Sequence, residues 1–116
     1  METVIIWHNP RCRKSREGLK YLQEKGIEPV IYDYIKNGIN PQELAEIIRK
    51  SGQPVTEFIR TKEKEYRELG LKDKSLTPEE FAQIAAKYPK LLQRPIVVKG
   101  DKAVLARPPE RIDAIL

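Results

Sequence analysis

The chain has little sulfur or imidazole: its 116 residues include one cysteine, Cys12, and one histidine, His8. A single cysteine excludes an internal disulfide, and zinc sites need several Cys or His ligands, so a structural zinc site is excluded too. The chain therefore contains no redox pair of its own. Any redox turnover at Cys12 needs a thiol supplied from outside.

A long apolar run is also missing. No stretch approaches the roughly 18 apolar residues of a membrane span. The beginning METVIIWHNP has no basic start ahead of a long apolar region, so we expect neither a secretion signal nor a membrane partner. A lone reduced thiol then favours the cytoplasm. Because 40% of the residues are hydrophobic, we expect a single domain, 1–116, whose core is stable without disulfides or metal ions.

Neither sign of charge dominates the sequence. The 22 Lys and Arg residues are interleaved with 17 Asp and Glu residues, for a net charge of +5. A basic balance is compatible with a polyanion partner, and a small anion fits it as well. Because the two signs are mixed along the chain, we expect no nucleic-acid partner.

The apolar pattern predicts a strand, helix, strand unit, then several helices and a hairpin. The expected elements are strands at 3–7 and 29–34, helices at 15–25, 41–51 and 78–88, a hairpin at 95–106 and a short helix within 107–116. A strand, helix, strand unit of this length favours parallel pairing through a right-handed crossover. No internal repeat or low-complexity segment interrupts this order.

Two of the helices carry sequence signals at their starts. Asn40 precedes Pro41 as cap and first-turn proline. Thr77 and Glu80 have the spacing of a capping box. The stripe behind that box, expected to be buried, is Phe81, Ile84, Ala85 and Tyr88. The charged segment 61–71 is expected to be a solvated surface, anchored by Tyr66 and Leu69.

This order of elements matches a thioredoxin-like α/β plan. In that plan a βαβ unit and a ββα unit share one mixed sheet, here with a helical insertion at about 40–90. The loop after the first strand carries the reactive thiol. Cys12 occupies that loop.

Cys12 lies among basic residues, in the stretch WHNPRCRKSREGL. A free cysteine has a pKa near 8.5, and a helix N-terminus or nearby cations lower it by roughly 1 to 5 units. The alternative is a small buried hydrophobe, the ordinary place of a free cysteine. Polar neighbours on both sides argue against a core position. We therefore predict a thiolate nucleophile in a pocket that also suits an oxyanion.

Three arginines stand beside apolar elements instead of within runs of mixed charge: Arg60, Arg94 and Arg107. Each is also compatible with a surface residue whose stem covers apolar side chains. Guanidinium groups bind the oxygens of a tetrahedral oxyanion in pairs. Together the three predict an anion pocket.

His8 and Ser15 flank the cysteine, and each has two interpretations. His8 either polarises the thiol or donates to the loop backbone, a structural role. The Ser15 hydroxyl is expected to donate to the thiolate, to cap the helix, or to do both.

Four ordered motifs carry a resemblance to a known family: HNPRCRKSR, IRTKEKEYRELGL, RPIVV and ARP. Together they resemble the glutaredoxin-coupled arsenate reductase family, ArsC, over nearly the whole chain. The resemblance implies that Cys12 is the catalytic cysteine and that His8 and Ser15 support its thiolate. It implies that Arg60, Arg94 and Arg107 bind the oxyanion and the arsenylated intermediate. Pro95 matches a proline that is typically cis and faces the active-site loop.

The implied reaction is reduction of arsenate to arsenite. Cys12 forms a covalent adduct, glutathione is the co-substrate and glutaredoxin is the protein partner. No metal and no bound cofactor are implied. The best-characterised reductases carry small uncharged residues directly after the cysteine, where this chain has Arg13 and Lys14.

Two other functions are open. One is a thiol oxidoreductase that acts on glutathione mixed disulfides through Cys12. That reaction needs less specificity for an oxyanion, so the three arginines argue against it. The other is a regulator of the Spx type that binds RNA polymerase. Such regulators commonly carry C-x-x-C, whereas this chain has CRKS.

Overall fold

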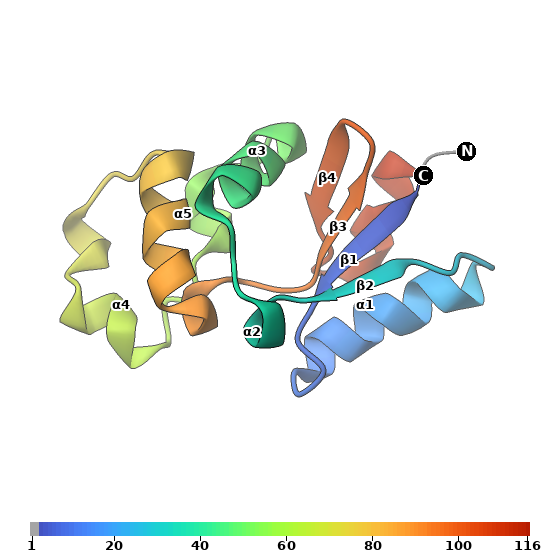
Figure 1. Ribbon diagram of the computed structural model, residues 1–116, viewed down its shortest axis with the longest axis horizontal. Coiled ribbons are helices and arrows are strands. Elements are labelled where there is room, and N and C mark those ends of the chain that lie inside the picture. Colours follow the sequence, from blue (N-terminus) through green and yellow to red (C-terminus); the bar gives the residue numbers. More distant parts are fainter. Residues whose placement is uncertain (1–2) are drawn as a thin grey trace.

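The computed structural model describes residues 3–116 and contains a four-stranded mixed sheet in the order β2-β1-β3-β4 (Figure 1). The strands are β1 (Val4–His8), β2 (Val30–Asp33), β3 (Ile96–Lys99) and β4 (Lys102–Leu105). β1 pairs with β2 in parallel and with β3 antiparallel, and β3 and β4 form a hairpin. The predicted thioredoxin-like plan is confirmed: a βαβ unit and a ββα unit share one sheet.

Helices cover both faces of the sheet. The α-helices are α1 (Arg13–Glu24), α2 (Tyr34–Asn37), α3 (Pro41–Ser51), α4 (Lys64–Glu68) and α5 (Pro78–Lys87). Short 3-10 helices are η1 (Val55–Phe58), η2 (Leu71–Asp73), η3 (Pro89–Leu91) and η4 (Pro109–Ile115). In Figure 1, α3, α4 and α5 lie away from α1, on the other side of the sheet, and the short α2 lies between these two groups at the end of β2. Within residues 3–116, no helix combines the length and apolar character that crossing a membrane requires.

The apolar run of β1 is explained by burial on both faces. Ile6 packs with Leu22 of α1 and Ile112 of η4 in one cluster, whereas Trp7 joins the cluster formed by α3 and α5 on the other side. Successive side chains of a strand point to opposite faces, so both faces of β1 need apolar residues. Fully burying one such side chain contributes about 1.5–3 kcal/mol.

The two predicted helix starts are confirmed. The Asn40 side chain accepts hydrogen bonds from two backbone N–H groups at the start of α3. At α5, Thr77 accepts from the Glu80 backbone N–H and the Glu80 carboxylate accepts from the Thr77 N–H, which completes the capping box. Tyr66 and Leu69 of the charged segment are partly buried against the core, as expected of anchors.

Three sequence predictions are wrong in detail. α1 begins at Arg13, two residues before the predicted start, with Cys12 as its N-cap. β2 ends at Asp33, because the Asp33 carboxylate accepts two N–H groups and starts α2 at Tyr34. Tyr88 lies past the end of α5 and is 39% exposed, so it does not extend the buried stripe.

Candidate active site

The loop between β1 and α1 is a tight turn that places Cys12 at the start of the helix. The Cys12 N–H donates to the Asn9 carbonyl at 2.9 Å, and the Arg11 N–H donates to Asn9 Oδ1 at 3.0 Å. The Cys12 carbonyl then accepts the first helical bond, from the Arg16 N–H. The thiol therefore lies at the N-terminus of α1, where free N–H groups carry partial positive charge.

The half-buried Cys12 thiol has a pKa below its ordinary value. Burial alone raises the pKa, but a hydrogen bond and charge from Arg94, with backbone N–H groups of Ser15 and Lys14, lower it by more. Each of these donors stabilises the thiolate and none stabilises the neutral thiol. The site therefore favours an anionic nucleophile.

The Ser15 hydroxyl supports the loop between β1 and α1. It is fully buried, accepts from the Asn9 N–H at 2.9 Å and lies 3.0 Å from His8 Nδ1. The N-cap of α1 is Cys12 and not Ser15, and Ser15 acts on the thiol through its backbone N–H; its support of the thiolate stays a prediction. The third residue of a helix still has a free N–H, which explains this role.

His8 lies at the end of β1, 6% exposed. Burial lowers the pKa of its imidazole, Asp33 opposes that shift and Arg16 adds to it. The net effect favours the neutral imidazole. Because its Nδ1 is hydrogen-bonded to the Ser15 hydroxyl, His8 helps to hold the loop between β1 and α1 in place.

Arg94 is the most unusual charge in the site. Its side chain is buried, and Nη1 donates only to backbone carbonyls, those of Lys90 at 3.3 Å and Leu92 at 3.2 Å. Within residues 3–116 no carboxylate pairs with Arg94, and its buried Nε has no hydrogen-bond partner. A buried guanidinium with no carboxylate partner is costly, so this side chain is suited to stabilise the Cys12 thiolate and to receive an anion.

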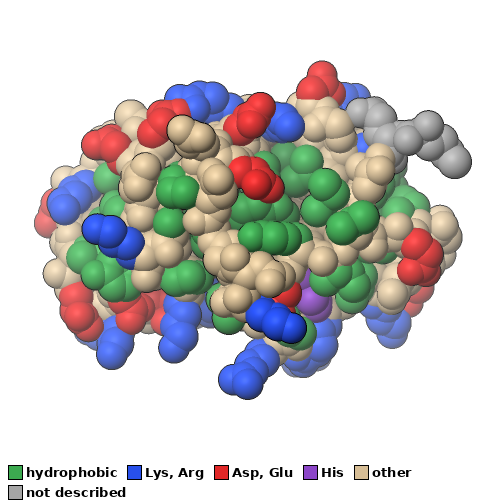
Figure 2. All heavy atoms as spheres, viewed as in Figure 1, with side chains coloured by type: hydrophobic (Ala, Val, Ile, Leu, Met, Phe, Trp, Pro, Cys, Tyr) green, Lys and Arg blue, Asp and Glu red, His purple; other side chains and the backbone are tan. Residues whose placement is uncertain are grey.

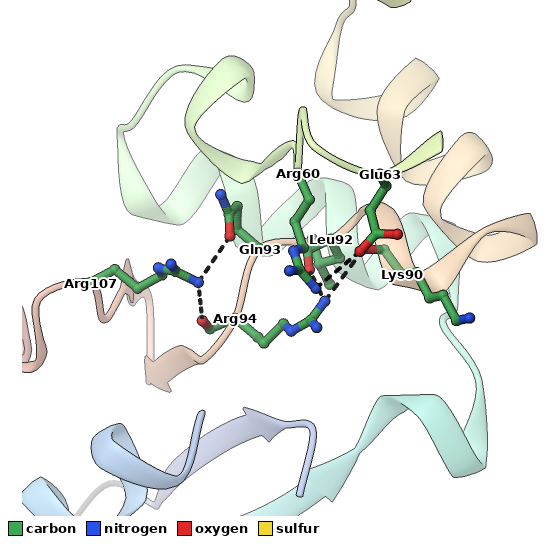
Figure 3. Close-up of polar contacts among 7 residues, drawn as sticks. All are labelled: Arg60, Glu63, Lys90, Leu92, Gln93, Arg94 and Arg107. Carbon is green, nitrogen blue, oxygen red and sulfur yellow. Dashed lines mark hydrogen bonds and ion pairs between the residues drawn. The ribbon is translucent and has the colours of Figure 1, made fainter. Parts of the chain in front are cut away.

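The other two arginines differ in their relation to Arg94 (Figure 3). Arg60 ion-pairs with Glu63 at 3.3 Å, and its guanidinium lies on the same side as that of Arg94. Arg107 donates to Gln93 Oε1 at 3.1 Å and to the Arg94 carbonyl at 3.3 Å. Figure 3 shows the Arg107 guanidinium on the opposite side of the Arg94 backbone. The guanidinium groups of Arg60 and Arg94 are thus brought together, whereas Arg107 holds the backbone carbonyl of Arg94.

Arg107 also lines a shallow pocket of about 200 Å³ beside the first turn of α1. Lys14 and Glu17 line the same pocket, together with Pro108. Figure 2 shows Lys and Arg side chains, interspersed with Asp and Glu, along the lower edge of the molecule, and Figure 1 places the loop between β1 and α1 at the centre of this edge. Basic side chains therefore lie near the thiol both in the buried part of the site, from Arg94, and at the surface, from Lys14.

Pro95 brings the Arg94 loop against α1. The Arg94–Pro95 peptide bond is cis, and the proline ring packs on Gly18 of the helix. A Cβ atom built on Gly18 would lie 2.5 Å from Pro95 Cγ, so this close approach needs glycine. The contact places Arg94 next to the helix that begins at Cys12.

Tyr34 belongs to the site, although the sequence analysis did not include it. Its side chain is fully buried, and its hydroxyl has no hydrogen-bond partner in the part of the chain that the structure describes. Burial raises the pKa of Tyr34 to about 12, Arg94 and Arg60 lower it, and Cys12 raises it. Charged groups from three other segments, Cys12, Arg60 and Arg94, therefore act electrostatically on the Tyr34 hydroxyl.

The strand pairing is the signal that would have found Tyr34. Asp33 pairs with His8 in the parallel register, so the residue after Asp33 lies beside the loop after His8. Sites form where the carboxyl ends of adjacent parallel strands meet at one edge of a sheet. Gln93, the partner of Arg107, carries no such signal.

The arrangement supports nucleophilic chemistry on an anion without a metal ligand set. Over residues 3–116, no three His, Cys, Asp or Glu side chains gather closely enough to hold a metal ion. A thiolate at a helix N-terminus next to an unpaired guanidinium can attack an electrophilic anion and hold the charge that develops.

Comparisons with known proteins place this chain in a family. The model of the ArsC family matches residues 7–115. A protein named arsenate reductase from Haemophilus influenzae is 42% identical over 115 residues, which cover 98% of this chain and 99% of that one. The uncharacterised Escherichia coli protein YfgD is 43% identical over 110 residues, covering 94% and 92%. A structure titled arsenate reductase from Vibrio cholerae has a TM-score of 0.90 at 39% identity, over 99% of this chain and 98% of that one. The chain belongs to the ArsC family.

Proposed function

We propose that this protein reduces arsenate to arsenite through a covalent adduct on Cys12, with glutathione as co-substrate and glutaredoxin as partner. Similarity to proteins named arsenate reductase supports the substrate. The observation that carries the chemistry is the juxtaposition of Cys12 with the buried Arg94, which has no carboxylate partner among residues 3–116. We place the reaction in the cytoplasm, where the glutathione pool keeps a lone thiol reduced.

In the first step, Arg94 and Arg60 hold the arsenate oxygens. The Cys12 thiolate attacks arsenic, a sulfur–arsenic bond forms, and one oxygen leaves as hydroxide. Arsenic stays in the pentavalent state in this step, so no electrons are transferred. The two guanidinium groups stabilise the negative charge that is concentrated on the remaining oxygens. Arg107 supports the step indirectly, because it fixes the Arg94 carbonyl.

In the second step, a glutathione thiolate attacks the Cys12 sulfur. A disulfide bond forms between the two sulfurs, and the electron pair of the sulfur–arsenic bond stays on arsenic. Arsenite therefore leaves with arsenic in the trivalent state, two electrons richer. In the third step, a glutaredoxin thiolate attacks the glutathione sulfur of the mixed disulfide. Cys12 is released as a thiolate for another cycle.

Intact-mass spectrometry tests this sequence of steps. Reduced glutathione cannot form a mixed disulfide with Cys12 unless an oxidant is present. We expect a mass gain of one glutathione only when arsenate is added, and loss of that gain when reduced glutaredoxin follows. Phosphate, which has the same shape and is not reduced, is the matched control and should give no adduct. An adduct that forms equally with phosphate would contradict the proposal.

A further inference from the structure

Two buried polar atoms in the site lack partners, and they belong to neighbouring side chains. Neither Tyr34 Oη nor Arg94 Nε has a hydrogen-bond partner among residues 3–116. Buried polar groups without partners are rare in native proteins, because each loses its bonds to water and gains none in return. The Arg94 Nε–H is a donor, and the Tyr34 hydroxyl, whose pKa burial raises although the neighbouring Arg94 lowers it, keeps its own proton to donate, so one acceptor placed between them would satisfy both donors.

The Tyr34 ring is held in a fixed position. It stacks on Trp7 with ring centroids 6.1 Å apart and an interplanar angle of 26°. The Asp33 carboxylate caps α2 directly before it and fixes the backbone. Packing on Trp7 and the cap of α2 therefore hold the Tyr34 ring where its hydroxyl has no hydrogen-bond partner among residues 3–116.

Tyr32 shows how a structural tyrosine behaves in the same place. It lies two residues earlier, and its ring also contacts Trp7, with centroids 5.0 Å apart. Its hydroxyl donates to the Gly38 carbonyl and is satisfied within the protein. Tyr34 differs from it in being fully buried, in lacking a protein partner and in lying within the field of Cys12 and two arginines.

We propose that Tyr34 is a third binding group of the site, whose phenol donates a hydrogen bond to the oxyanion held by Arg94. This inference rests on the proposed function, which supplies the tetrahedral oxyanion. With a pKa of about 12, the phenol keeps its proton at pH 7 and acts as a donor. The thiolate already has Arg94 and two backbone N–H groups, whereas an arsenate offers several oxygens that need donors.

The test compares Tyr34→Phe with the matched control Tyr32→Phe. Three quantities are measured: kcat/KM for arsenate, the arsenate concentration that half-protects Cys12 from iodoacetamide, and the pKa of Cys12 from the pH dependence of alkylation. Losing one hydrogen bond to a charged group costs roughly tenfold to 100-fold in affinity. We expect Tyr34→Phe to lose that factor in kcat/KM and in protection, with the Cys12 pKa unchanged. Tyr32→Phe should match the wild type in all three.

A merely structural role for Tyr34 gives a different result. Because the hydroxyl has no partner, we expect Tyr34→Phe to melt at the same temperature as the wild type or higher. Equal arsenate protection in the two phenylalanine variants would overturn the inference and leave the proposed function intact. A raised Cys12 pKa in Tyr34→Phe with unchanged protection would also overturn it, because the phenol would then serve the thiolate.

A second measurement keeps the inference testable if Tyr34→Phe fails to fold. In otherwise wild-type protein with 3-fluorotyrosine at position 34 only, the fluorine resonance should shift when arsenate is added. If arsenate protects Cys12 from iodoacetamide in this protein but the fluorine resonance does not shift, the role of Tyr34 alone would be overturned. If arsenate fails to protect Cys12 in the wild-type protein, both the assignment of arsenate as substrate and the role of Tyr34 would be overturned.

Discussion

Gly18 of α1 and Pro95 of the Arg94 loop touch so closely that the helix residue must lack a side chain. A Cβ atom at Gly18 would approach Pro95 Cγ to 2.5 Å, a distance that real Cβ atoms essentially never show. The contact joins the two segments that carry Cys12 and Arg94. Their closeness, on which the chemistry depends, therefore depends on one glycine.

The Gly18→Ala variant tests this contact. In an ordinary helix interior, replacing glycine by alanine adds up to about 1 kcal/mol of stability. Here we expect a loss of about 1–3 kcal/mol, because the added methyl group must displace the proline ring. Urea denaturation measures the free energy of unfolding.

The control for that variant is Lys20→Ala, an exposed position on the same helix. It should change the free energy of unfolding by less than about 0.5 kcal/mol. If Gly18→Ala proved more stable than the wild type, the close approach to Pro95 would not hold in solution.

The pKa of Cys12 depends most on Arg94. The thiolate is the form that alkylates, so the rate with iodoacetamide rises with pH around the pKa of the thiol. We expect the wild-type midpoint below the ordinary value of about 8.5, and a higher midpoint in Arg94→Met. Arg111→Met, which removes an exposed arginine paired with Glu57, should keep the wild-type midpoint. Equal midpoints in the Arg94 and Arg111 variants would contradict this account of the thiolate.

The Ser15 hydroxyl is expected to stabilise the active-site loop. Ser15→Ala leaves the Asn9 N–H without its acceptor and removes the hydrogen bond to His8. A buried polar group left without a partner costs about 1–3 kcal/mol, which thermal or urea denaturation detects. The exposed Ser75→Ala is the matched control and should be near neutral. A loss no larger than the control's would show that the hydroxyl is dispensable.

Local signals explain what the sequence analysis predicted correctly. The position of Cys12 follows from an apolar run, an Asn-Pro turn and a helical pattern, all within about a dozen residues. The caps at Asn40 and Thr77 likewise depend on neighbours in the chain. Such features need no knowledge of tertiary contacts.

The features that the sequence analysis missed concern side chains whose partners are set by the fold. Ser15 binds the Asn9 N–H because the turn at residues 9–12 returns the chain to the helix, which its own neighbours do not reveal. Arg107 turns to Gln93 and the Arg94 carbonyl, so its guanidinium does not face that of Arg94. The sequence pattern places Tyr34 at the end of the predicted strand at 29–34 and assigns it no role in the site. Only the register of β2 against β1 places it at the site.

The central claim is that Cys12 reduces arsenate. The most direct measurement is arsenate-dependent NADPH consumption with glutathione, glutaredoxin and glutathione reductase, in the wild type and in Cys12→Ser. Because the chain has no other cysteine, no second thiol can replace Cys12. We predict consumption that requires arsenate in the wild type and none above background in Cys12→Ser. Arsenate reduction that persists in Cys12→Ser, or its absence from a folded wild-type protein, would contradict the account.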